Sequence, residues 1–154
     1  MNPLVKEALK HSKINSLIQD IKNGKEKISI TGVNEPAKAH LVYSALNYSG
    51  KLPFIVCQNV TDAKKLIQDL AFYDNTIETV YIPSREVIYY NIQTESKEIS
   101  NQRAYAISKL INKEECIYIT TIDSLMTKML PKETYENINI HIKLGGELEI
   151  NNLK

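Results

Sequence analysis

The feature that most constrains this chain is an alternation of short apolar runs with longer amphipathic segments. The runs have the length of β-strands, and the segments between them repeat their apolar side chains with the period of an α-helix. The apolar runs cover residues 28–31, 52–57, 79–82 and 116–120. Parallel strands need a crossover between them, and a helix is its usual form. The sequence therefore predicts an α/β protein with a mainly parallel sheet and helices on both faces.

The first two helices have clear boundary signals. Residues 3–22 carry apolar side chains at helical spacing, and Gly24 follows as a stop signal. Pro36 suits the first turn of a second helix, because its missing N–H is not needed there, and Gly50 marks the end of that helix.

Three more helices and a last strand are expected in the second half of the chain. Thr61 or Asp62 is expected to cap the third helix. Residues 96–111 form the fourth, and Pro131 ends a short fifth one. The alternating isoleucines of residues 137–144 predict a strand with one wet face.

This pattern divides the chain into three parts. Residues 1–24 are expected to form an N-terminal helix that packs on the domain, and residues 25–144 to form the α/β domain itself. Residues 145–154 begin with a Gly-Gly turn and are expected to start a connection to a following domain that this chain lacks.

Composition excludes several classes of function. The 154 residues carry a net charge of only +1, so no overall field draws the chain to nucleic acid or to a membrane. No apolar run reaches the roughly 18 residues of a transmembrane helix, and the charged N-terminal segment does not resemble a secretion signal. We therefore expect a cytoplasmic protein.

The cysteines and histidines do not have the spacing of a metal site. Cys57 and Cys116 each lie in an apolar strand-like run, which indicates buried core thiols in a reducing compartment. The three histidines are isolated in the sequence. No metal ligand is expected.

Residues 31–41, "TGVNEPAKAHL", resemble a phosphate-binding loop with working parts removed. The pattern G-x-x-x-x-G-K-[ST] is met by Gly32 and Lys38, after an apolar run and before a helix. Ala37 replaces the second glycine, and Ala39 replaces the hydroxyl residue that would bind Mg²⁺. Pro36 removes one donor N–H from the loop. We interpret Gly32, Lys38 and Ala39 as relics that bind no cofactor.

A nucleotide site would also need an acidic residue at the end of a later strand to hold the metal. Asp123 is the best candidate, because it follows the run "CIYITTID". It also precedes a short apolar helix, and we interpret it as the N-cap of that helix.

Taken together, four stretches of the chain resemble the N-terminal module of the bacterial transcription-repair coupling factors. That module is itself similar to domain 1a of UvrB, which has a RecA-like fold with an intact loop. The resemblance covers roughly residues 5–150 and is carried by "TGVNEPAKAHLVYSAL", "PFIVCQNVTDAKKLIQDLAFY", "IPSREVIYYNIQTESKEISNQRAYAISKL" and "IYITTIDSLMTKMLP". The third stretch is the most specific, with a strand ending in proline, Glu86, Tyr89 or Tyr90, and the run from Ser96 to Arg103.

The resemblance implies a partial domain with a degenerate P-loop and no catalytic residues. The full-length protein would be an ATP-dependent and Mg²⁺-dependent DNA translocase that acts on double-stranded DNA. It would displace stalled RNA polymerase and recruit nucleotide excision repair through UvrA. The present chain would be a non-catalytic scaffold for the insertion that contacts UvrA, and would meet the following domains of the same chain.

Two departures from UvrB matter for this reading. Pro83 and Ser96 are thirteen residues apart, too few for the long tyrosine-rich hairpin of UvrB. Core or interface packing is therefore the expected role of Tyr89 and Tyr90, and stacking on a nucleic-acid base is the alternative. The acidic box of the motor fold is missing, which is expected if an insertion interrupts the domain. The alternatives are an independent P-loop ATPase or nucleic-acid-binding domain that uses Lys38 in an unconventional loop, and an α/β interaction domain of another family.

Overall fold

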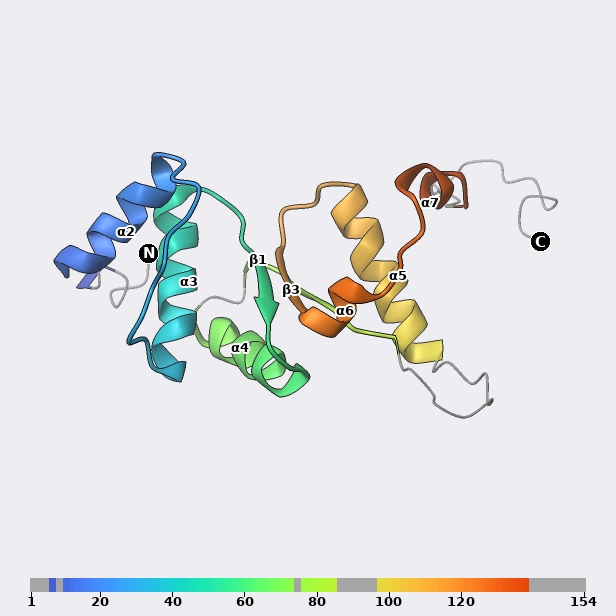
Figure 1. The fold of residues 1–154 in the computed structure, drawn as a ribbon, viewed down its shortest axis with the longest axis horizontal. Helices are drawn as coiled ribbons and strands as arrows, with labels where there is room; N and C mark the ends of the chain where they lie inside the picture. Colours follow the sequence, from blue (N-terminus) through green and yellow to red (C-terminus); the bar gives the residue numbers. More distant parts are fainter. Residues whose placement is uncertain (1–5, 8–9, 74–75, 86–96, 139–154) are drawn as a thin grey trace.

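The computed structural model describes residues 6–7, 10–73, 76–85 and 97–138, with side chains up to residue 135. The described part is elongated, with helices α2 and α3 at one end, α5 and α7 at the other, and a small sheet between them (Figure 1). Tyr89 and Tyr90 lie outside the described residues, as do residues 145–154, for which a connection to a following domain was expected.

The sheet has three parallel strands. They are β1 (Phe54–Cys57), β2 (Thr79–Ile82) and β3 (Ile117–Thr121), in the order β1-β3-β2. In the register, Ile119 of β3 is opposite Ile55 of β1 and Tyr81 of β2. The last of the described strands in the sequence is therefore the central one, and the parallel α/β class expected from the sequence is confirmed.

The described residues form six helices: α2 (Ser12–Lys22), α3 (Glu35–Ser49), α4 (Val60–Tyr73), α5 (Lys97–Ile111), α6 (Ile122–Met126) and α7 (Lys132–Ile138). Gly50 ends α3 in the left-handed conformation (φ 69°), as its position predicted. Lys51 then donates to the carbonyl of Ile21 at 2.8 Å and ties the end of α2 to the start of the strand segment. None of the described helices has the length and apolar character needed to cross a bilayer.

The two faces of β3 belong to two separate cores. Ile117 and Ile119 pack with α3 and α4 in a cluster of buried residues, which also includes Ala39, Tyr43, Leu46, Ala63 and Leu70. Successive residues of a strand point to opposite faces, so Cys116 and Tyr118 lie on the other side, where they pack with Val80, Ile82 and Ala106 of α5. Helices therefore cover both faces of the sheet, as predicted.

Residues 28–31 do not form the predicted first strand. They run as irregular chain beside α3, and Ile30 is 52% exposed. Only two apolar side chains, Ile28 and Ile30, supported that prediction, and Lys27, Ser29 and Thr31 interrupt them. Four residues with so little apolar surface gain little from burial in a sheet.

Two helices, α2 and α4, begin at residues other than those expected. The first helix is interrupted at Lys10 and His11, and His11 takes an extended conformation before α2. The backbone N–H of Asp62 donates to the Asn59 side chain at 2.8 Å, so Asn59 caps α4 where Thr61 or Asp62 was expected. Asn and Asp are equally good caps, and position alone decides between them.

The C-terminal elements also differ from the prediction. Helix α6 ends at Met126, before the expected stop at Pro131, because Thr127 leaves the helix with extended backbone (ψ 128°). Residues 137 and 138 belong to α7, so the predicted strand 137–144 does not begin there, and the rest of it lies outside the described residues.

We expect Ile119→Ala to lower the free energy of unfolding by about 2–5 kcal/mol, since Ile119 is fully buried in the central strand. Ile122→Ala is the matched control, because Ile122 lies three residues away and is 50% exposed; its cost should be below about 1 kcal/mol. Urea unfolding of the three proteins measures both values. Equal losses for the two variants would contradict the central position of β3.

Candidate functional site

The loop with P-loop character lies where the sequence placed it, immediately before α3. Gly32 has a φ of 75°, a left-handed conformation that favours glycine over all other residues. Asn34 caps α3, and its side chain accepts from the N–H of Ala37 at 3.2 Å. That N–H would face a phosphate in a working loop. Here the N–H of Ala37 is already hydrogen-bonded to Asn34, and the neighbouring Pro36 has no N–H.

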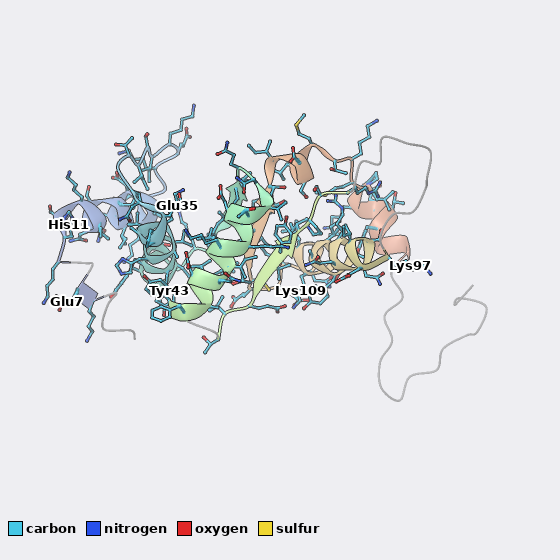
Figure 2. The ribbon with its side chains drawn as sticks, turned by 90° about the horizontal axis from the view of Figure 1, so that it is seen from below. Glu7, His11, Glu35, Tyr43, Lys97 and Lys109 are labelled. Carbon is cyan, nitrogen blue, oxygen red and sulfur yellow. The ribbon has the colours of Figure 1, made fainter. Side chains whose placement is uncertain are left out.

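Lys38 is held by a neighbour on its own helix. Its ammonium forms an ion pair with Glu35, and both side chains are about half exposed, at 51% and 50%. Figure 2 shows Glu35 at the start of α3. The hydrogen bond between the two groups lowers the pKa of Glu35 and raises the pKa of Lys38. Lys38 therefore keeps its positive charge, and the carboxylate of Glu35, three residues earlier on the same helix, compensates that charge.

Ala39 points away from the loop. It is fully buried in the cluster between α3, α4 and the sheet, beside Tyr43 and Ile119. The residue at this position of a working loop would place a hydroxyl on a metal ion. In this chain the position is part of the core, where a hydroxyl would need a hydrogen-bond partner.

A cavity of about 410 Å³ opens between the loop, the end of β1 and α4. Its charged lining consists of three carboxylates and two ammonium groups: Glu35, Asp62, Asp69, Lys38 and Lys65. A triphosphate needs an excess of cations around it. The acidic excess in this cavity is unfavourable for such a ligand.

Cys57 also lines this cavity, which corrects one prediction. It is only partly buried, whereas Cys116 is buried as expected. Burial, and then the negative charge of Asp62, raise the pKa of the Cys57 thiol. The thiol therefore remains protonated at neutral pH and is not an activated nucleophile.

Asp123 is neither a cap nor part of the loop cavity. It is exposed in the first turn of α6, and Thr121 caps that helix by accepting from the N–H of Ser124 at 3.4 Å. Asp123 is not among the residues that line the cavity beside Lys38. The structure therefore does not bring together the lysine and the carboxylate that a metal–nucleotide site would need.

A buried arginine joins three elements at the carboxyl end of the sheet. Arg103 of α5 is only 5% exposed, and its Nη1 donates to the carbonyl of Pro83 and, at 3.0 Å, to Oγ of Ser124. Ser124 in turn donates to the same Pro83 carbonyl at 3.0 Å. The sequence singled out Arg103 as the end of the run that begins at Ser96, but it did not identify these partners.

A second polar cluster, at the amino end of the sheet, was missed by the sequence analysis. Lys109 bridges Glu78 and Glu114, with Nζ–O distances of 2.7 Å to each, and lies near the C-terminal end of α5 (Figure 2). The hydrogen bond from Lys109 lowers the pKa of Glu78. Glu78, Glu114 and Cys116 have ligand atoms within 4.8 Å of one another. Lys109 already supplies the positive charge between the carboxylates, and a cation would have to displace it.

The described residues thus form an α/β protein with a three-stranded parallel sheet and an altered loop before α3. Comparison with known proteins relates the chain to proteins named transcription-repair-coupling factor. It is 20% identical over 150 residues to the one from Staphylococcus haemolyticus, which covers 97% of this chain and 13% of the relative. It is 23% identical over 134 residues to the one from Bacillus subtilis, which covers 87% of this chain and 11% of the relative.

The match is confined to a small part of these relatives. The chain spans about an eighth of the length of the curated relatives it matches, and the relative from Staphylococcus epidermidis gives 20% identity over 127 residues, 11% of its length. No protein-family model and no solved structure matches the chain. The comparisons therefore support a relationship to the coupling factors without specifying a UvrB-like module.

We expect Arg103→Met to lower the free energy of unfolding by about 2–4 kcal/mol, because the change removes two charge-assisted hydrogen bonds and leaves buried acceptors without this donor. Lys97→Met, on the exposed first turn of the same helix, is the control and should change stability by less than about 0.5 kcal/mol. Chemical denaturation measures the free energy of unfolding of both variants. A similar small effect of both variants would show that the Arg103 contacts do not stabilise the fold.

Proposed function

We propose that this chain is a non-catalytic scaffold segment of a transcription-repair coupling factor. The relationship to the coupling factors over most of the chain supports this assignment. In the third and most specific stretch of the family pattern, Pro83 and Arg103 are hydrogen-bonded although they are twenty residues apart. The parts of that stretch that can be described therefore form one structural unit.

The observation that carries the non-catalytic part of the proposal is the pairing of Lys38 with Glu35. A P-loop lysine contributes to catalysis only when its ammonium can reach the outer phosphates. Lys38 instead points to a carboxylate of its own helix, in a cavity with excess acid. The buried Ala39 supplies no hydroxyl for Mg²⁺. The changes affect the binding of phosphate by the backbone, the positive charge of the lysine and the binding of the metal ion. Restoring one of these properties would not restore the site.

In this proposal the chemistry resides in other parts of the full-length protein. The whole coupling factor would be an ATP-dependent translocase on double-stranded DNA that displaces stalled RNA polymerase and recruits UvrA. This segment would support the insertion that contacts UvrA and would pack against the following domains. An independent ATPase would differ from it in one measurable property, the binding of nucleotide.

We expect the chain to show no saturable binding of a fluorescent ATP analogue at millimolar concentration, with or without Mg²⁺, because Lys38 is paired with Glu35, the N–H of Ala37 is bonded to Asn34 and Pro36 has no N–H. Fluorescence anisotropy measures the binding. Saturable, Mg²⁺-dependent binding that Lys38→Ala abolishes and Lys64→Ala retains would support the independent ATPase. Lys64 is a suitable control, because it is exposed on α4 and does not line the loop cavity.

We also expect the chain to retain no UvrA in a pull-down, whereas a coupling factor that carries the insertion retains it. The reason is that, in this proposal, the recruiting surface lies in the insertion. The two baits are compared at equal loading, and the unfolding midpoint of this chain is measured in parallel to show that the bait is folded. Comparable capture by both baits would place the recruiting surface within this chain and refute the scaffold role.

A further inference from the structure

Strand β1 is an edge strand, and among the described residues only one of its two edges is paired. That inner edge bonds to β3, where the carbonyl of Pro53 accepts from the N–H of Tyr118 at 3.2 Å. The backbone groups of successive residues in a strand point alternately to its two edges. The N–H and C=O groups of Phe54 and Val56 are therefore directed to the outer edge of β1, which the described sheet leaves open.

A groove runs along this outer edge. It is the cavity of about 410 Å³ beside the altered loop, and its lining includes residues of β1 but none of β2 or β3. Ile55 and Val56 of β1 form one wall, and Ile30 and Val33, from the chain before α3, line the groove on the other side. All the residues that line the groove belong to the described part of the chain.

The groove exposes apolar surface. Ile30 is 52% exposed and Val56 is 45% exposed, and the adjacent Phe54 of β1 is 46% exposed. Val42 of α3 and Leu66 of α4 also line the groove and are only partly buried against the core. An open strand edge with apolar side chains beside it is a surface on which a further strand can pair.

The shape of the groove favours a single strand as its occupant. The segment that contains Ile30 and Val33 lies across the groove from β1, on the side of α3 (Figure 1). A partner that brought a whole sheet to this edge, including a second copy of this chain, would collide with that segment. The volume is also within the roughly 300–1,000 Å³ of sites that hold small ligands, which suits a short peptide segment and not a folded domain.

The charged residues of the groove favour a basic occupant. Three carboxylates, Glu35, Asp62 and Asp69, stand against the ammonium groups of Lys38 and Lys65. The ion pair between Lys38 and Glu35 leaves one ammonium group for two carboxylates. Side chains of an extended peptide alternate between two faces, so apolar ones can enter the groove while basic ones lie at its charged rim.

From this geometry we propose that the outer edge of β1 binds a single extended peptide segment of a partner protein, with apolar and basic side chains at alternate positions. The segment adds a fourth strand to the sheet. Its backbone pairs with the N–H and C=O groups of Phe54 and Val56, and its apolar side chains cover Ile30 and Val42. Peptides bound in this way gain affinity from main-chain hydrogen bonds and specificity from alternate side chains. Such binding goes beyond the scaffold role and does not depend on the relationship to the coupling factors.

The test is an NMR titration of the whole chain with the synthetic peptide acetyl-Lys-Ile-Lys-Ile-Lys-Ile-amide. We expect saturable shifts of the Phe54 and Val56 amide signals. An analogue with every amide nitrogen methylated keeps the side chains but cannot donate to β1, and it should bind about tenfold more weakly or less. The peptide with glutamate in place of lysine should bind about threefold more weakly or less at low salt.

The matched variants are Val56→Pro and Val56→Ala. Proline removes the outward N–H and leaves the bonds between β1 and β3 in place, so it should weaken peptide binding by about tenfold or more. Alanine keeps the N–H and should cost about threefold or less. Unfolding midpoints of both variants show whether the sheet is intact.

Three results would overturn the proposal. Equal binding of the methylated analogue would show that no strand is added, and equal binding of the glutamate peptide would show that the groove does not select basic side chains. Shifts of the Phe54 and Val56 signals that depend on the concentration of the chain alone would show that a second copy occupies the edge.

Discussion

The fold depends on the double burial of one strand. All five residues of β3 are buried, and the strand is hydrogen-bonded on both edges and packed on both faces. Ile117 and Ile119 complete the core beneath α3 and α4, while Cys116 and Tyr118 complete the core beneath α5. Strand β2 shares this role, because Tyr81 packs against the core beneath α3 and α4 while Val80 and Ile82 pack in the core beneath α5. The position of β3 therefore determines both cores and, at its carboxyl end, the cap of α6 at Thr121.

The two helical layers attached to this strand differ in the charges around their cavities. On the α3 side, the cavity beside Lys38 is rich in carboxylates, and the lysine is paired with Glu35. On the α5 side, the cavity beside Arg103 has three cations and no carboxylate among its described lining residues. The loop that resembles a phosphate loop in sequence thus lies beside an excess of carboxylates. The distribution of charge in space gives information that the motif alone does not.

The sequence predicted well those parts of the fold in which the signal is local. Strand β2 and helices α3 and α5 have the expected limits within a residue, because turn residues such as Gly50 and Pro83 adjoin long periodic runs. The prediction of a strand at residues 28–31 was wrong, because it depended on the apolar side chains of only two isoleucines. The predicted caps of α4 and α6 were also wrong. Asn59 and Thr121 compete with neighbouring residues that can also cap a helix, and only the final geometry decides between them.

The candidate site was predictable only in part. Glu35 lies three residues before Lys38, a spacing at which helical side chains meet, so this pair could have been found from the sequence. Ala39 was interpreted only as a relic of the loop, and the structure shows in addition that it is fully buried. The convergence of Arg85, Arg103 and Lys128 could not have been found, because it depends on how α5, α7 and the segment after α6 pack together.

The strand order has a consequence for synthesis on the ribosome. Strands β1 and β2 are not paired with each other, because β3, the last of the described strands to be made, lies between them. A nascent chain that has released residues up to 115 therefore holds two strands whose edges have no partner within this sheet. Long-range parallel pairing is slow, and unpaired strands expose the chain to association with other chains. The sheet can close only after residue 121 has emerged, so the whole of this unit folds in one late step rather than from its N-terminus onward.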